Sequence, residues 1–137
     1  MLSITQFPWG IILLATIAYF ILGALWFTPL FGGLYDRAIG FDRTKQKKWP
    51  MIYYIGPLFG CAIGALAMAL ISEFIQPKSL FDASILGFII GIGFALPIST
   101  VNAITPKMEQ PILFGLVTGG YHTVGLTLVS ILLYSLR

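Results

Sequence analysis

The chain alternates between four long apolar stretches and short polar ones. The apolar stretches cover residues 8–27, 51–74, 80–104 and 111–136. Each has about 20 residues or more, the length that an α-helix needs to cross the hydrocarbon core of a bilayer. None shows the alternation of a transmembrane strand, and a helix satisfies its own backbone hydrogen bonds in lipid. The pattern predicts a single domain over residues 1–137, an all-α membrane protein with four transmembrane helices in one bundle.

Composition supports this class. Hydrophobic residues make up 58% of the chain and charged residues 9%, whereas a soluble domain carries about 25% charged residues. The net charge of +3 comes from basic residues gathered mostly in one loop, so we expect membrane lipids as partners and no nucleic acid. The single cysteine, Cys61, lies in an apolar stretch, which predicts a buried packing residue.

The basic residues also predict an orientation. Cytoplasmic loops of membrane proteins carry an excess of Lys and Arg. The loops after the first and third spans hold six of these residues, and the opposite side holds only Lys78 and Arg137. The sequence therefore predicts a multi-pass protein of the cell membrane with loop 28–50 in the cytoplasm and both termini outside.

Loop 28–50 has a pattern of its own. Its apolar residues recur at helical spacing over residues 31–39, which predicts a short helix on the inner membrane interface. A basic run follows, and it is either the positive-inside signal alone or a site for anionic lipid headgroups. Its members are Arg43, Lys45, Lys47 and Lys48.

Part of the first span has an echo 68 residues later. Residues 15–30 read ATIAYFILGALWFTPL, and residues 83–98 read ASILGFIIGIGFALPI. The two share Gly-x-x-aromatic-x-x-Pro-aliphatic, ending in Pro29 and in Pro97. Apolar segments also match by chance, so this is either a coincidence or a repeat of two helix pairs related by an axis along the membrane normal.

Small residues recur every four positions in three of the predicted helices. Because residues four apart share one helix face, each run forms a small-residue ladder that lets another backbone approach closely. Such packing joins helices within one bundle or between protomers, and both remain open. The ladders are Gly56, Gly60 and Gly64 in the second helix; Ala83, Gly87, Gly91, Ala95, Ser99 and Ala103 in the third; and Gly115, Gly119 and Thr123 in the fourth.

His122 is the only histidine and, tyrosines aside, the one ionisable side chain deep in a predicted span. It follows Gln110 by 12 residues, about 18 Å along a helix and so near the middle of the bilayer. An ionisable residue at this depth is a candidate functional residue. Three roles stay open: a hydrogen bond across helices, the handling of protons or a solute, and ligation of a metal or cofactor. The third lacks support, because no Asp, Glu or second His accompanies it.

Further intramembrane polar candidates are few. Thr100 and Asn102 lie towards the cytoplasmic end of the third span, and Tyr121 precedes His122. Together these side chains are the candidate lining of a proton or solute pathway, although Asn102 is as well suited to capping or bridging helices.

Two prolines fall inside predicted spans. Pro57 and Pro97 each remove one backbone hydrogen bond and favour a kink. Ser99 and Thr100 are the candidates to bond the carbonyl that Pro97 leaves free.

One stretch resembles a known family. Residues 23–32, GALWFTPLFG, resemble the motif that ends the first helix of domain-of-unknown-function family 1761, a group of small, mostly bacterial membrane proteins. Its motif positions here include Gly23, Trp26, Pro29 and Gly32. Asn102, Pro111 and the run Gly120-Tyr121-His122 also resemble the family, whereas Phe27 stands where Tyr is usual. The resemblance implies a four-helix fold in a membrane, the bacterial inner membrane, and no particular activity.

The residues then favour a function without catalysis. No Ser/His/Asp set, phosphate-binding glycine loop or carboxylate pair lies at a useful position, so we expect no enzyme and no cofactor, and a bound lipid is the one ligand class left open. The leading hypothesis is a protein that acts by helix packing, as a homo-oligomer or an accessory subunit of a membrane complex. The alternatives are a proton or solute pathway centred on His122, and a lipid- or pigment-binding subunit anchored by Trp26 and Trp49.

Overall fold

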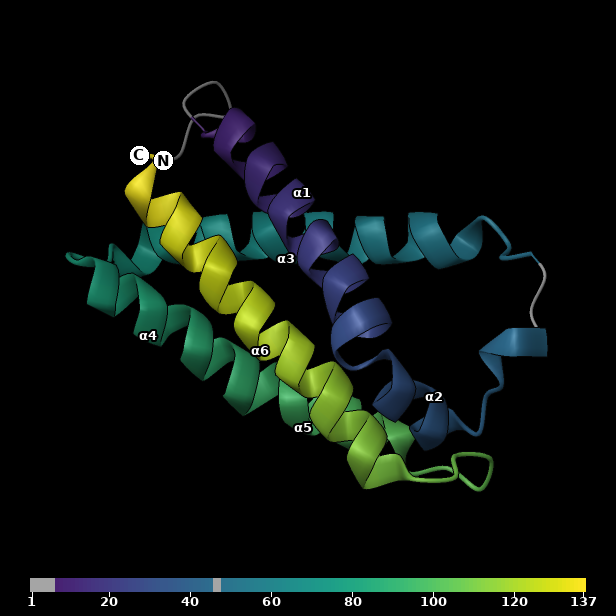
Figure 1. Ribbon diagram of the computed structural model, residues 1–137. Coiled ribbons are helices and arrows are strands. Elements are labelled where there is room, and N and C mark those ends of the chain that lie inside the picture. The colour runs from purple at the N-terminus through teal and green to yellow at the C-terminus, as the bar shows by residue number, and fades with distance from the viewer. Residues whose placement is uncertain (1–6, 46–47) are drawn as a thin grey trace.

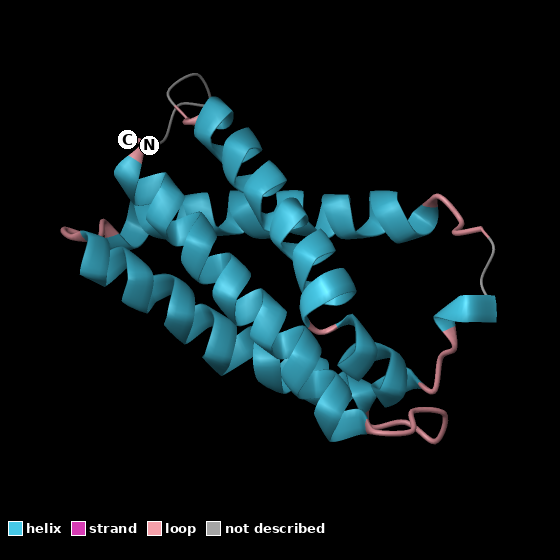
Figure 2. Cartoon of the chain, viewed as in Figure 1, coloured by secondary structure: helices cyan, strands magenta, loops and turns pink. Residues whose placement is uncertain are grey.

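The computed structural model describes residues 7–45 and 48–137, and within these ranges every regular element is a helix. The elements are α1 (Trp9–Leu25), the π-helical turn η2 (Trp26–Leu30), α2 (Gly32–Ile39), the short 3-10 turn η3 (Arg43–Lys45), α3 (Ile52–Ile75), α4 (Leu80–Ile90), the π-helical turn η4 (Gly91–Ala95), α5 (Leu96–Ala103) and α6 (Pro111–Ser135) (Figures 1 and 2).

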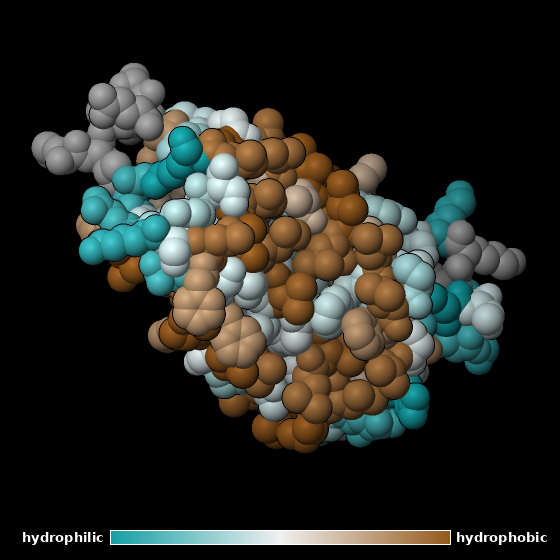
Figure 3. Space-filling view, turned by 60° about the vertical axis from the view of Figure 1, so that its left-hand side comes forward, coloured by the Kyte–Doolittle hydropathy of each residue, from teal (hydrophilic) through white to brown (hydrophobic). Residues whose placement is uncertain are grey.

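Four helical segments are long and apolar enough to cross a membrane. They are Trp9–Leu30, Ile52–Ile75, Leu80–Ala103 and Pro111–Ser135. The predicted all-α fold with four spans is therefore confirmed, and the observed bounds lie within three residues of the expected ones. Apolar side chains cover the middle of the face in Figure 3, and hydrophilic ones gather at its two ends. This surface suits a multi-pass membrane protein.

Helix α6 is the centre of the bundle, because it packs against α1, α2, α3, α4 and α5. The α4–η4–α5 segment follows α6 along its length (Figure 1). Glycines bring the two backbones together: a Cβ atom added at Gly87 would lie 2.5 Å from the carbonyl oxygen of Leu126, and one at Gly119 would lie 2.6 Å from Cα of Leu96. The ladders of the third and fourth spans thus face each other within one chain.

Helix α3 takes a different course and crosses behind α1 and α6 (Figure 1). The first of its buried residues is Cys61, and the others follow towards the C-terminal end: Ala65, Met68, Ala69 and Ser72. An ion pair between Glu73 and Arg137 joins the C-terminal ends of α3 and α6. The first nine residues of α3, from Ile52 to Gly60, contain no buried residue, and this part of the helix extends away from the bundle (Figure 1).

Both π-helical turns fall within the echoed sequence. At η2 the Phe31 amide donates to the Trp26 carbonyl over 2.7 Å, and at η4 the Leu96 amide donates to the Gly91 carbonyl. Each bond spans five residues instead of four, so each turn takes up one extra residue close to a proline. By contrast, α3 continues through Pro57 as one helix.

The Thr100 hydroxyl has another acceptor than the one expected. It donates to the carbonyl of Leu96 at 2.9 Å, which is its own fourth preceding residue. The carbonyl that Pro97 leaves without its α-helical donor belongs to Gly93. Thr100 therefore does not replace the bond that Pro97 removes, and the π-helical register at η4 accommodates the proline instead.

The short helix predicted in the first loop is α2. It ends at Gly40, whose positive φ of 66° is a left-handed conformation that favours glycine. The Gln110 amide donates to the Ala38 carbonyl over 3.0 Å, and the Glu109 carboxylate lies against Gly40. These contacts place α2 and the loop between α5 and α6 at the same end of the molecule (Figure 1).

Candidate functional site

Four polar side chains meet where α1, α3 and α6 approach one another, and they define the midplane cluster: Tyr19, Cys61, Tyr121 and His122. The Tyr19 hydroxyl lies 2.5 Å from Nδ1 of His122. The Tyr121 hydroxyl donates to the Tyr19 carbonyl over 3.2 Å and lies 3.3 Å from Sγ of Cys61. Each of these residues lies near the middle of its span, so the cluster lies at the depth where water is scarcest.

The hydrogen bond between Tyr19 and His122 engages one of the two ring nitrogens, Nδ1. With the phenol as donor, Nδ1 accepts and the neutral imidazole carries its hydrogen on Nε2. Nε2 makes no hydrogen bond with the part of the chain that the structure describes. The ring also lies against Tyr121, with centroids 4.7 Å apart. His122 therefore joins α6 to α1 through Nδ1, and its Nε2 makes no hydrogen bond to a described residue.

Glycines make room for the two tyrosines. The Tyr19 ring occupies the space that a Cβ atom at Gly125 would need, and a Cβ at Gly64 would lie 3.4 Å from the same ring. A Cβ at Gly23 would lie 2.9 Å from the Tyr121 hydroxyl oxygen. Gly23 and Gly64, which the sequence offered as motif and packing positions, thus serve the midplane cluster from α1 and α3.

Trp26 attaches the end of the first span to α6. Its indole Nε1 donates to the Val117 carbonyl over 2.9 Å, and its ring lies 4.4 Å, centroid to centroid, from that of Phe31. Gly120 leaves room for the indole, since a Cβ there would lie 3.4 Å from Cζ2 of Trp26. The tryptophan of the motif is therefore half-buried between helices and does not point freely towards a membrane interface.

The rest of the motif builds a cap for one backbone carbonyl. In an α-helix the Phe31 amide would donate to the Phe27 carbonyl, but here it donates to the Trp26 carbonyl in the π-helical register. The Phe27 carbonyl therefore lacks its α-helical donor. Nη2 of Arg43 donates to that carbonyl over 2.9 Å. A Cβ at Gly32 would lie 2.8 Å from the same oxygen. Pro29, with no amide hydrogen, and Gly32, with no side chain, thus shape the turn that Arg43 closes.

Arg43 is held in this place by Asp36. The carboxylate of Asp36 accepts from Nε at 2.7 Å and from Nη2 at 3.0 Å. Lys45 pairs with Asp42 at 3.3 Å, and hydrogen bonds from Thr44 keep the pKa of the Asp42 carboxyl below its ordinary value. Two of the four residues considered for lipid headgroups therefore have carboxylate partners in the chain. Of the other two, Lys48 is exposed and Lys47 lies outside the described residues.

The structure separates the other candidate pathway residues from His122. Thr100 packs against Gly115, which is seven residues, or about 10 Å along α6, from His122. The Asn102 side chain is exposed and has no hydrogen bond to a residue that the structure describes. Of the four pathway candidates, only Tyr121 and His122 are brought together. In residues 7–45 and 48–137, no three side chains of His, Cys, Asp or Glu form a group that could hold a metal ion.

A sequence model described as "Protein of unknown function (DUF1761)" matches residues 11–134. The chain belongs to the DUF1761 family. The resemblance that GALWFTPLFG suggested is thereby confirmed over most of the chain. No curated protein and no solved structure matches the sequence.

In this DUF1761 chain, Phe27 lies between two tyrosines. Its ring meets those of Tyr121 and Tyr35 edge-on, at centroid distances of 5.1 and 5.0 Å. The ring links the midplane cluster to α2, a contact that needs an aromatic face and no hydroxyl.

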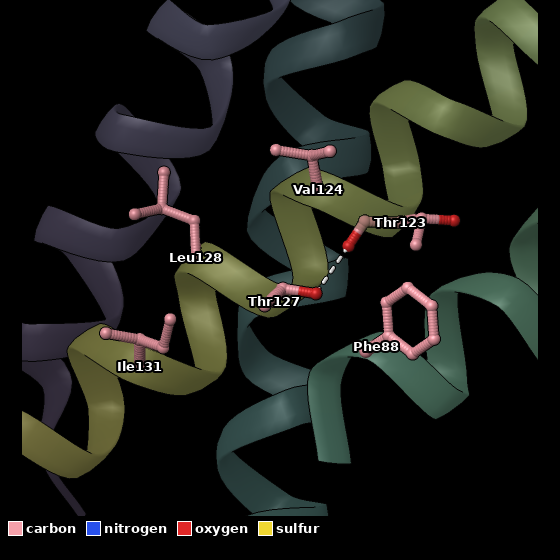
Figure 4. A pocket seen from close by; sticks show the side chains of 6 residues that line it. All are labelled: Phe88, Thr123, Val124, Thr127, Leu128 and Ile131. Atoms are coloured by element: carbon pink, nitrogen blue, oxygen red, sulfur yellow. Dashed lines mark hydrogen bonds between the residues drawn. The ribbon is translucent and has the colours of Figure 1, made fainter. Parts of the chain in front are cut away.

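An apolar groove lies on another face of the DUF1761 bundle, between α4 and α6. Its volume is about 320 Å³. The Thr127 hydroxyl donates to the Thr123 carbonyl over 2.7 Å, as Figure 4 shows, and the Thr123 hydroxyl donates to Gly119. Both hydroxyls are therefore used within α6, and the groove offers mainly hydrocarbon surface. Its lining residues are Phe88, Thr123, Val124, Thr127, Leu128 and Ile131.

The sequence analysis did not single out Tyr19, although the position of this residue in its span is informative. A tyrosine in the middle of an apolar span needs a hydrogen-bond partner in lipid, so it is a candidate wherever it occurs. Nothing in the sequence named the partner, which is 103 residues away. Arg43 carried even less signal, because a basic residue in a loop predicted to be cytoplasmic already has an explanation in the positive-inside rule.

Replacement of Tyr19 by Phe should destabilise the fold, because it removes the hydroxyl that is hydrogen-bonded to His122 and keeps the ring. We expect the free energy of unfolding to fall by about 0.5–2 kcal/mol, the range of interhelical hydrogen bonds in membranes. Unfolding by detergent titration measures this change. Tyr54→Phe, at a side chain that is 52% exposed, is the matched control, and an equal loss in both variants would contradict the role given to the bond.

Replacement of Arg43 by Gln should loosen α2, because the Phe27 carbonyl and Asp36 both lose their partner. We expect hydrogen–deuterium exchange of amides 32–41 to rise about tenfold or more. Lys45→Gln is the control, since its ion pair with Asp42 is exposed and worth little. Unchanged exchange in the Arg43 variant would show that the cap does not hold the turn.

Proposed function

We propose that this DUF1761 chain is a membrane protein without catalytic activity, which acts by helix packing as a homo-oligomer or as an accessory subunit of a membrane complex. The observation that supports this most directly is the bond between Tyr19 and His122. The most conspicuous polar pair at the bilayer midplane is used to join α1 to α6. Tyr121 and Trp26 are likewise hydrogen-bonded to carbonyls of another helix.

A protein built in this way acts through its outer surface. Most of that surface is apolar and suits lipid or another transmembrane helix. The groove between α4 and α6 suits an acyl chain, because its hydroxyls are already bonded. Membrane lipids and other membrane subunits are therefore the proposed partners, and a lipid chain is the proposed ligand.

The orientation belongs to the same proposal. The loops after the first and third spans hold six of the eight basic residues, and α2 and the loop between α5 and α6 lie at the same end of the molecule. We place this end in the cytoplasm and both termini on the outer side of a bacterial inner membrane. Arg43 and Lys45 form ion pairs with Asp36 and Asp42. The paired side chains remain charged, so the loop is still polar and suits the aqueous side of the membrane.

Gentle purification tests the proposed function. Chains that work as a homo-oligomer or a subunit should leave the membrane, in native nanodiscs, in particles of at least twice the chain mass of 15.0 kDa. Native mass spectrometry gives the mass and identifies any second protein. Particles that hold one chain and no other protein, also after cross-linking in the membrane, would contradict the proposal.

A proton or solute pathway is the second candidate, and one observation favours it. His122 keeps Nε2 without a bond to a described residue, while Nδ1 holds the Tyr19 hydroxyl. Histidine is one of the residues that relay protons within membrane proteins, and here its ring is bonded to a phenol near the middle of the spans.

A flux assay in proteoliposomes separates this candidate from the first. If the pair relays protons, His122→Ala and Tyr19→Phe should both abolish dissipation of an imposed pH gradient. Asn102→Ala, at an exposed side chain outside the cluster, should leave the flux unchanged. A wild-type rate equal to that of empty liposomes, or equal flux in the His122 variant, removes the pathway.

A further inference from the structure

The part of α3 from Ile52 to Ile63 presents one face that no other part of the described chain covers. Its most exposed side chains are Ile52, Phe59 and Ile63, at 66%, 66% and 65%. Gly56 and Gly60 lie between them on the same face, because the spacings of four, three and four residues return to one side of a helix. The result, here called the α3 face, is a row of apolar side chains with two gaps.

The two gaps are unoccupied by other helices of the chain. A Cβ at Gly60 would meet nothing within 4 Å, and one at Gly56 would meet only Ile52 of its own helix. The glycines of the other ladders behave differently. At Gly87 and Gly119 the backbone of another helix lies so close that no side chain fits. The α3 ladder therefore has the same spacing as those ladders and only one member, Gly64, that is in contact with another helix.

The exposed area of the chain points to a covering partner. A compact monomer of 15.0 kDa exposes about 7,000 Å², whereas this chain exposes 8753 Å². A standard protein–protein interface buries about 800 Å² on each partner, so the surplus of about 1,700 Å² on one chain is large enough to supply its side of such an interface. The projecting half of α3 contributes to this surplus, since none of its residues from Ile52 to Gly60 is buried.

We propose that the α3 face is the dimer interface of this protein, and that its occupant is the α3 face of a second copy. This inference rests on the proposed function and names its partner. In a two-fold dimer with its axis along the membrane normal, Gly56 and Gly60 of both chains lie at the same depth and form the crossing point. Phe59 and Ile63 of each copy then fill the gaps beside the glycines of the other.

The sequence of α3 permits this self-association. No charged residue occurs between Ile52 and Ser72, so two identical helices meet without repulsion. Glycines four apart allow helices to cross closely at about −40°. Because the half-helix projects from the bundle (Figure 1), two copies touch there before the rest of their bundles collide.

Cysteine cross-linking in native membranes locates the interface. Cys61 is the only cysteine, so Cys61→Ala gives a background for single cysteines. Phe59→Cys should form a disulfide-linked dimer upon mild oxidation. Leu116→Cys, 54% exposed on α6, is the matched control and should stay monomeric. No dimer at either position, or equal dimer at both, overturns the proposal, as does a disulfide of Phe59→Cys with a different protein.

A second variant keeps the native cysteine and tests the glycine gap. Gly60→Leu should weaken dimerisation about tenfold or more, by filling the crossing point, and leave the melting temperature of the monomer unchanged. Gly10→Leu, at a position with equally open space, should not affect dimerisation. If oligomers persist in Gly60→Leu, the α3 interface is wrong and the proposed function stands. If the wild type is a solitary monomer, both are wrong.

Discussion

In the middle of a bilayer, a phenol and an imidazole have no water to bond, and each must find a partner in protein. Tyr19 and His122 satisfy each other, at 2.5 Å between the hydroxyl and Nδ1. The bond joins α1 to α6, and α3 packs against the same two helices through Cys61 and Gly64. The Tyr19 ring requires glycine at position 125 and a small residue at 64, and Tyr121 requires one at 23. Moving any of these helices would break a bond that lipid cannot replace.

The same constraint explains the motif at the end of the first span. Pro29 has no amide hydrogen, and the chain takes up a π-helical register around it, which leaves the Phe27 carbonyl without its helical donor. Arg43 supplies the missing bond from η3, with Asp36 holding the guanidinium and Gly32 leaving it space. The sequence motif by which the chain resembles its family is, in structural terms, a capped helix end.

The two copies of the echoed sequence form the same kind of local structure but pack differently against the rest of the chain. Each copy contains a π-helical turn near its proline. After the second copy, glycines hold α5 and α6 together, whereas α3 leaves the bundle over its N-terminal half. The difference follows from the residues at the interface: Gly87 and Gly91 in α4–η4 admit the α6 backbone, whereas Tyr19 in α1 stands where Gly87 stands in the echo. A two-fold axis within the chain is therefore not evident in its packing.

The sequence by itself determined the four spans, the short helix α2 and the small-residue ladders, because these depend on local hydrophobicity and spacing. It also pointed to His122, as an ionisable group far from water. Only the tertiary structure decided that Tyr19, 103 residues away, is its partner, that Arg43 caps Phe27, and that Gly56 and Gly60 are uncovered while Gly87 and Gly119 are filled. Spacing along a helix shows which residues share a face. Which helix meets that face is decided by how all four spans pack together.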